Sequence, residues 1–80
     1  MIRISKSTRL KPDLVIEKAS TFFGKGGVGL KETERGGCCI SFEGAGGYVT
    51  VSLAEDNQST DVDVEAREWE YDAKRFLGHI

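Results

Sequence analysis

The chain has 80 residues and a mass of 8.8 kDa, which fits one small domain over residues 1–80 and excludes a multi-domain enzyme or a membrane channel. Its 11 basic and 13 acidic residues give a net charge of −2, which argues against a nucleic-acid binder that relies on bulk basicity. Apolar residues make up 39% of the chain and are regularly spaced, so we expect a folded core.

The N-terminal third predicts a strand followed by a helix. In residues 2–8, Ile2 and Ile4 alternate with polar residues, which is typical of a half-buried strand. Pro12, followed by an acidic residue, marks a helix start, and Gly24 marks its end. The apolar stripe of this helix has the spacing i, i+4, i+7, i+8 and consists of Val15, Ala19, Phe22 and Phe23.

The middle of the chain predicts an antiparallel meander. Residues 29–35 are polar and extended and give at most a weak strand. Three segments then alternate between apolar and polar residues: 38–43, 48–53 and 61–66. A glycine-rich turn at residues 36–37 precedes the first of these segments, and a second one at residues 44–47 separates the first from the second. We expect a polar loop at residues 56–60 before the third.

The C-terminal segment changes to a helical period. Its apolar residues recur at i, i+4, i+7, i+8 and i+11: Trp69, Ala73, Phe76, Leu77 and Ile80. Acidic residues lie near its start and basic residues near its end, which suits the helix dipole, and Glu70 should pair with Lys74. The order β-α-β-β-β-β-α predicts an α+β two-layer sandwich, with an antiparallel sheet of four or five strands and two helices on one face.

Charge is unevenly divided along the chain. Residues 1–35 hold eight basic and four acidic residues, a net charge of +4, whereas residues 36–80 hold three basic and nine acidic residues, a net charge of −6. The outer face of the first strand is basic and polar (Arg3, Ser5, Ser7, Arg9), and that of the last strand is acidic (Asp61, Asp63, Glu65). We expect these two strands to be neighbours, so that opposite charges meet. The alternative is that the asymmetry marks a docking surface for a partner.

The element order resembles a reduced helix-grip fold, the fold of the START and Bet v 1-like superfamily. The resemblance lies in the strand Asp61–Glu65 running into a helix that carries Trp69, Phe76 and Leu77. Members of that superfamily hold apolar ligands between the sheet and the C-terminal helix. The resemblance therefore implies a ligand-carrying fold, and it assigns no functional residues.

The string Gly24–Gly29 resembles the start of a deviant Walker A motif. A phosphate cradle needs a following Lys and a Ser or Thr that open a helix, whereas here Leu30 and Lys31 occupy those positions. The string also follows a helix rather than a strand. We therefore interpret it as a connection and expect no nucleotide binding.

The remaining reactive residues do not form a catalytic or metal-binding set. Cys38 and Cys39 are adjacent, and we expect two free thiols in a reducing compartment, with Cys38 in the core and Cys39 on the open sheet face. His79 is the one histidine, so neither a zinc site nor a catalytic triad can be assembled. We expect no enzyme, no cofactor and no bound metal.

Localisation follows from what the chain lacks. No apolar run approaches the roughly 20 residues that span a bilayer, and residues 1–6 contain no apolar signal-peptide region. We therefore expect a soluble, cytoplasmic protein that does not bind membranes.

Two hypotheses for function remain open. The first is a non-enzymatic module that binds a protein partner or a second copy through the polar sheet face near Cys39, Ser41, Thr50 and Ser52. The second is a carrier of a small apolar ligand, held by Phe22, Phe42, Trp69, Ala73 and Phe76. Nucleic acid is not expected, because Tyr48 is the single aromatic residue on that face.

Overall fold

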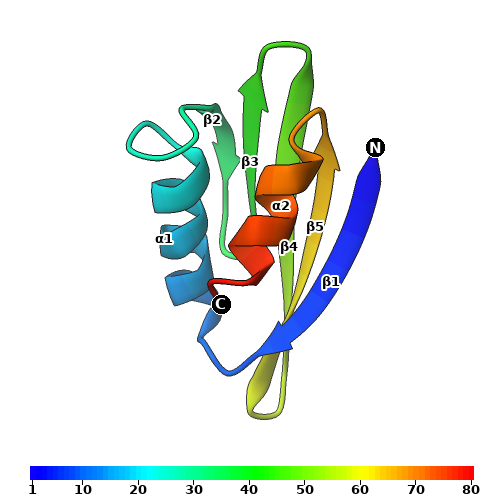
Figure 1. The fold of residues 1–80 in the computed structure, drawn as a ribbon. Coiled ribbons are helices and arrows are strands. Elements are labelled where there is room, and N and C mark those ends of the chain that lie inside the picture. Colours follow the sequence, from blue (N-terminus) through cyan, green and yellow to red (C-terminus); the bar gives the residue numbers. More distant parts are fainter.

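A computed structural model describes all residues from Met1 to Ile80 (Figure 1). The strands are β1 (Ile2–Thr8), β2 (Lys31–Arg35), β3 (Cys39–Gly44), β4 (Gly47–Asp56) and β5 (Ser59–Arg67), and the helices are α1 (Pro12–Phe23) and α2 (Glu70–Leu77). All five strands form one antiparallel sheet in the order β1-β5-β4-β3-β2. The predicted α+β architecture and its element order are confirmed.

The first strand of the chain pairs with the last one. Arg3 lies opposite Glu65 in the register of β1 and β5, and its guanidinium contacts the Asp63 carboxylate at 2.7 Å. Ser5 donates a hydrogen bond to the same carboxylate at 3.2 Å. The predicted pairing of the basic strand with the acidic strand is therefore confirmed, and internal ion pairing accounts for part of the charge asymmetry.

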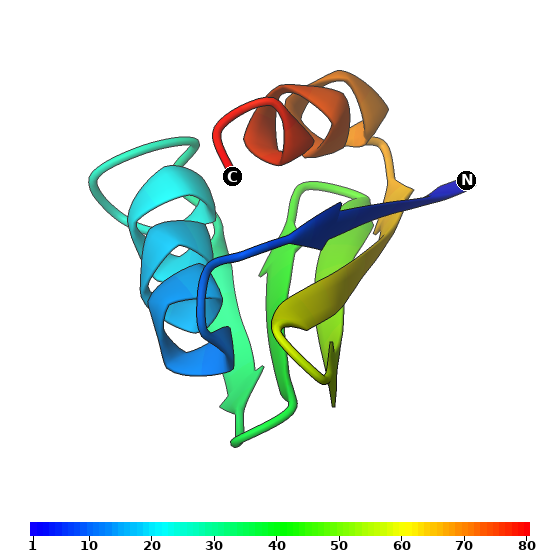
Figure 2. The same ribbon diagram turned by 90° about the horizontal axis from the view of Figure 1, so that it is seen from below.

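Both helices cover the same face of the sheet, and the other face is bare (Figure 2). α1 packs on β3 and β4, and α2 packs on β5 and β1. Fourteen buried apolar side chains form the core between these layers: Val15, Ile16, Ala19, Phe23, Leu30, Ile40, Phe42, Val49, Val51, Val62, Val64, Ala66, Ala73 and Phe76. Alternation along each strand explains this arrangement, since every second side chain points toward the helices.

The hairpin between β4 and β5 is longer than its polar sequence indicates. Asp56 pairs with Ser59, so only Asn57 and Gln58 remain in the turn, and the expected loop at residues 56–60 is wrong. Asn57 has a φ of 49°, a left-handed conformation that asparagine tolerates better than most residues. Thr60 is buried, and its hydroxyl donates a hydrogen bond to the Leu10 carbonyl at 2.8 Å.

The two cysteines differ from expectation. Cys38 and Cys39 are joined by a disulfide, so the prediction of free thiols is wrong. Cys38 is exposed rather than in the core, because β3 begins only at Cys39. The extended alternation that would send adjacent side chains to opposite faces therefore does not apply to residue 38. Gly36 and Gly37 precede the pair and have free space around them.

The start of α2 also departs from the predicted pairing. Glu70 does not pair with Lys74; its carboxylate contacts the Met1 amino group at 3.3 Å and accepts a hydrogen bond from the Glu68 backbone. Backbone N–H groups, first its own and then that of Glu68, lower the pKa of Glu70. The carboxylate thus serves the N-terminal end of α2, where a negative charge is favourable.

Candidate functional site

The two outer strands of the sheet differ in how well they are protected. All five residues of β2 are exposed, and four of them are charged. Arg35 and Glu32 form an ion pair at 2.9 Å, and Arg35 also donates to the Ser20 hydroxyl of α1 at 2.8 Å. The hydrogen bond from Arg35 lowers the pKa of Glu32. A charged, short edge strand of this kind resists pairing with a further strand.

The free side of β1, named here the β1 edge, is different. β1 is the outermost strand beyond β5, so one of its two backbone sides has no strand neighbour. Ile2 and Ile4 point to the helix side and are only half-buried. Lys6 is the one charged residue on that side of the strand, and its ammonium donates to the Leu77 carbonyl at the end of α2 at 2.8 Å. The lysine is thereby held against α2, a favourable place for a cation.

The charges along the β1 edge are all positive. Arg3, Lys6 and Arg9 lie on or directly after the strand, and no acidic residue precedes Asp13. Arg3 is paired with Asp63 on the neighbouring strand, whereas Arg9 has no ion-pair partner. The β1 edge therefore combines a backbone side without a strand neighbour, two half-buried isoleucines and basic side chains, of which Arg9 has no ion-pair partner.

The open face of the sheet, by contrast, satisfies its own polar groups. Ser41 and Thr50 share a hydrogen bond of 3.2 Å near the centre of the face. The Tyr48 hydroxyl donates to Glu65 at 2.6 Å, and this bond is the main cause of the raised pKa of Tyr48. Arg3 likewise contacts Asp63, so several polar side chains of this face bind one another.

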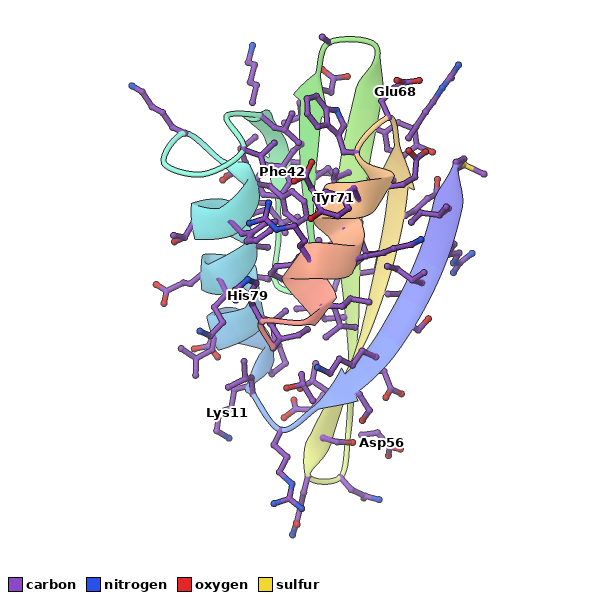
Figure 3. The ribbon with its side chains drawn as sticks, in the orientation of Figure 1. Lys11, Phe42, Asp56, Glu68, Tyr71 and His79 are labelled. Atoms are coloured by element: carbon purple, nitrogen blue, oxygen red, sulfur yellow. A yellow bond between two sulfur atoms is a disulfide. The ribbon has the colours of Figure 1, made fainter.

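The five residues predicted to hold an apolar ligand all belong to the layer between the sheet and the helices. Phe42, which is labelled in Figure 3, is fully buried, as are Ala73 and Phe76. Phe22 and Trp69 are half-buried. Phe22 and Phe76 have ring centroids 5.7 Å apart. Phe23 packs between them and Phe42, at 5.3 Å from Phe76 and 5.5 Å from Phe42. All five residues thus belong to the core cluster or pack against it.

The surface hollows do not coincide with that group. Of the five predicted residues, Phe22 alone lines a hollow, one of about 470 Å³ between the end of α1 and α2. Trp69 instead lies against Gly44, where an added Cβ would come within 3.0 Å of its ring. Its indole N–H is buried without a hydrogen-bond partner.

The glycine-rich loop after α1 uses its own backbone donors. The N–H groups of Gly27 and Gly29 donate to the Gly24 carbonyl, at 3.1 and 2.8 Å. Those of Val28 and Leu30 donate to the last carbonyls of α1, at 2.8 Å each. The loop therefore closes the end of a helix and has no array of free N–H groups for a phosphate.

Two further observations complete the chemistry of the surface. No three His, Cys, Asp or Glu side chains are grouped so that they could hold a metal ion. Neither helix has the length and apolar character needed to cross a membrane.

Comparison of the chain with protein-family models, with curated proteins and with solved structures gives no match.

Sequence reasoning missed the β1 edge as a candidate site. The signal was present, because residues 2–8 contain isoleucines and no acid, whereas residues 31–35 are almost wholly charged. This difference becomes informative only with the strand order, which places these two segments at the opposite edges of one sheet.

Proposed function

We propose that this chain is a non-enzymatic binding module that takes up an extended segment of a partner protein as a sixth strand at the β1 edge. The contrast between the two outer strands carries the proposal. β2 is protected by charge along its whole length, whereas β1 has half-buried isoleucines and a free backbone side. In strand addition, main-chain hydrogen bonds supply affinity and alternate side chains supply specificity.

The side chains beside the edge define the partner sequence. On the helix side, an added strand would place its side chains beside Ile2 and Ile4, which favours apolar residues. On the open side, its side chains would lie near Arg3, which favours acidic residues. The fitting partner is therefore a segment in which apolar and acidic residues alternate.

Charge also distinguishes this partner from a second copy of the chain. Two β1 strands side by side would bring together two sets of Arg3, Lys6 and Arg9 with no acidic residue between them. Like charges along a seam oppose pairing, whereas an acidic strand is attracted to it. The proposal therefore commits to a different protein as the partner.

A designed peptide tests the proposal directly. The probe is a peptide of about eight residues that alternates Val and Glu, the length of an ordinary strand. We expect it to shift the backbone amide NMR signals of residues 2–8, and to bind at least about threefold more tightly than a Val-Lys peptide, since each cross-strand charge pair is worth roughly 0.2–1 kcal/mol. Backbone N-methylation of the Val-Glu peptide should abolish binding, because it removes the donors.

Matched variants identify the edge that is used. Arg3→Glu should weaken the binding of the Val-Glu peptide and strengthen the binding of the Val-Lys peptide. Glu34→Lys, the corresponding charge reversal on the β2 edge, should change neither affinity. Shifts centred on Ser41 and Thr50 would move the site to the open face, and equal binding of the N-methylated peptide would exclude strand addition.

Native mass spectrometry of the protein as purified distinguishes this proposal from self-association and from binding of a small apolar ligand. A monomer is expected. The mass of a dimer would indicate that the partner is a second copy of this chain rather than a different protein. A mass above that of the bare chain by a small molecule would favour the apolar-ligand carrier implied by the helix-grip resemblance, with Phe22 and Trp69 at its accessible side.

A further inference from the structure

The Cys38–Cys39 disulfide lies at the surface, where the β2–β3 hairpin turns. Cys38 is exposed and Cys39 is half-buried, and the chain contains no other cysteine. The backbone on both sides is anchored by other bonds: Leu53 donates to the Cys38 carbonyl at 2.7 Å, and Gly36 donates to the Cys39 carbonyl at 2.9 Å. The sulfur atoms can therefore react while the hairpin stays in register.

This disulfide does not act as a staple for the fold. A disulfide stabilises a protein mainly by closing a loop in the unfolded chain, and the effect grows with the number of residues enclosed. Adjacent cysteines enclose no intervening residues, so the constraint on the unfolded chain is minimal. The hairpin is held by its ladder with β4, in which Cys39 lies opposite Ser52 and Ile40 opposite Val51.

We propose that Cys38–Cys39 is a reversible redox site whose substrate is a dithiol reductant. A thiolate of the reductant attacks the exposed Cys38 sulfur, forms a mixed disulfide and expels the Cys39 thiolate, which takes up a proton. The second thiol of the reductant loses its proton, attacks its own sulfur in the mixed disulfide and expels the Cys38 thiolate, which is protonated. The protein gains two electrons and two protons, and the reductant leaves as a disulfide.

The reduced form has a different surface at the turn. Without the sulfur–sulfur bond, residue 38 is free to extend β3, and its side chain then points to the helix side like Ile40. A hollow of about 330 Å³ lies on that side beside Gly36 and Gly37, with Ile16 and Glu17 of α1 in its lining. The reduced Cys38 thiol has space to enter it, next to the one apolar residue there.

Thiol counting with a mass readout tests the site. The protein is alkylated with iodoacetamide under native conditions before and after treatment with dithiothreitol. We expect no adduct before reduction and two adducts after it. When dithiothreitol is removed and oxidised glutathione is added before alkylation, we expect the disulfide to re-form, with no adduct and with the chain still monomeric. In the reduced protein, amide exchange should change at Cys38 and Cys39 and remain the same at the anchoring donors Gly36 and Leu53 and in β1 and β5.

Two variants provide controls. Cys38→Ser should leave one thiol that is alkylated without any reduction. The double variant Cys38→Ser, Cys39→Ser should fold with the same urea midpoint and should show no change in amide exchange upon addition of dithiothreitol. Two adducts without reduction, failure of dithiothreitol to reduce the folded protein, or reoxidation to disulfide-linked dimers would each overturn the proposal. It stands independently of strand addition at β1, and the peptide experiment does not bear on it.

Discussion

Gly44 makes room for the only tryptophan of the chain. A Cβ at this position would overlap the Leu30 side chain and press on the Trp69 ring at 3.0 Å. Both neighbours are part of the core or packed against it, so neither can move without disturbing its surroundings. The absence of a side chain here is thus a packing requirement, because Gly44 has no unusual φ.

Gly44→Ala should destabilise the fold by about 1–3 kcal/mol, the range for overpacking a core. The measurement is urea unfolding followed by Trp69 fluorescence, which should also shift in the folded baseline. Gly37→Ala is the matched control, since nothing lies within 4 Å of its added Cβ. An equal loss in both variants would mean that glycine is needed for another reason than packing against Trp69.

The environment of Tyr48 leads us to expect that folding stability depends on pH in the alkaline range. Its hydrogen bond to Glu65 and its burial raise the pKa of the folded-state phenol above the value of about 10 for an exposed tyrosine. The unfolded chain therefore ionises first, so the contribution of Tyr48 to stability is complete below pH 10 and is lost as pH rises through the folded-state pKa.

A tyrosinate absorbance titration measures this shift. The difference between the wild-type protein and Tyr48→Phe should have its midpoint above pH 10. Glu65→Gln retains an acceptor but removes the charge, and it should lower that midpoint. A midpoint unaffected by Glu65→Gln would show that Glu65 is not the partner of Tyr48 in solution.

The cysteines mark the limit of residue-level reasoning from sequence. Cys39 was placed correctly on the open face, where it lies opposite Ser52. The position of Cys38 could not be deduced, because it depends on whether the strand begins one residue earlier or later. Gly36 and Gly37 leave the backbone free to bend at that point, and propensity alone does not determine where such a bend ends.

At the scale of elements, α2 is attached to the sheet by a few large side chains. Phe76 is fully buried and packs against Phe22 and Phe23, whereas Tyr71 on the outer side of the same helix is 73% exposed (Figure 3). Arg75 lies over the rings of Phe22 and Tyr71, at 5.3 and 5.9 Å. The helix has eight residues, too few to be stable without this packing.

Phe76→Ala should therefore cost about 3–5 kcal/mol, as is usual for a buried Phe. A chain of this size has a total stability of roughly 4–12 kcal/mol, so the variant should be partly unfolded at moderate temperature. Tyr71→Ala should stay within about 0.5 kcal/mol of wild type. Thermal unfolding followed by circular dichroism distinguishes the two, and similar losses in both would contradict the assigned orientation of α2.

The elements with strong hydrophobic period were predictable from sequence, and the polar ones were not. Ile2 and Ile4 define β1, and Pro12 and Gly24 bracket α1, as the structure confirms. β2 has no apolar residue, so its extended form depends on pairing with β3 rather than on its own sequence. Propensity is a weak guide where tertiary hydrogen bonds decide.

At the scale of the whole molecule, the basic first part of the chain meets the acidic remainder inside one fold. Arg3 pairs with Asp63, and the Met1 amino group pairs with Glu70. The attachment of the N-terminal strand to its neighbours therefore depends partly on ion pairs that are open to solvent. Interactions of this kind are screened by salt, with a Debye length that falls from about 30 Å at 0.01 M to about 10 Å at 0.1 M.

We expect the urea midpoint to fall as sodium chloride is raised from about 0.01 to 0.1 M, the range over which screening sets in. Asp63→Arg should lower the midpoint at low salt and reduce its dependence on salt. Asp56→Asn is the control, because Asp56 forms no ion pair, and its salt dependence should resemble that of wild type. A midpoint that rises with salt would show that repulsion outweighs these pairs.

The pairing of β1 with β5 has a consequence for how the chain is made. Ile2 and Ala66 are register partners, so β1 leaves the ribosome long before its neighbour is synthesised. During that interval both sides of β1 lack a neighbouring strand, and its isoleucines are uncovered. We expect the basic residues on and after the strand to oppose its aggregation during that interval, because charged side chains disfavour association of exposed strands. The basic residues on which the proposed preference for an acidic partner depends would then first protect the nascent chain.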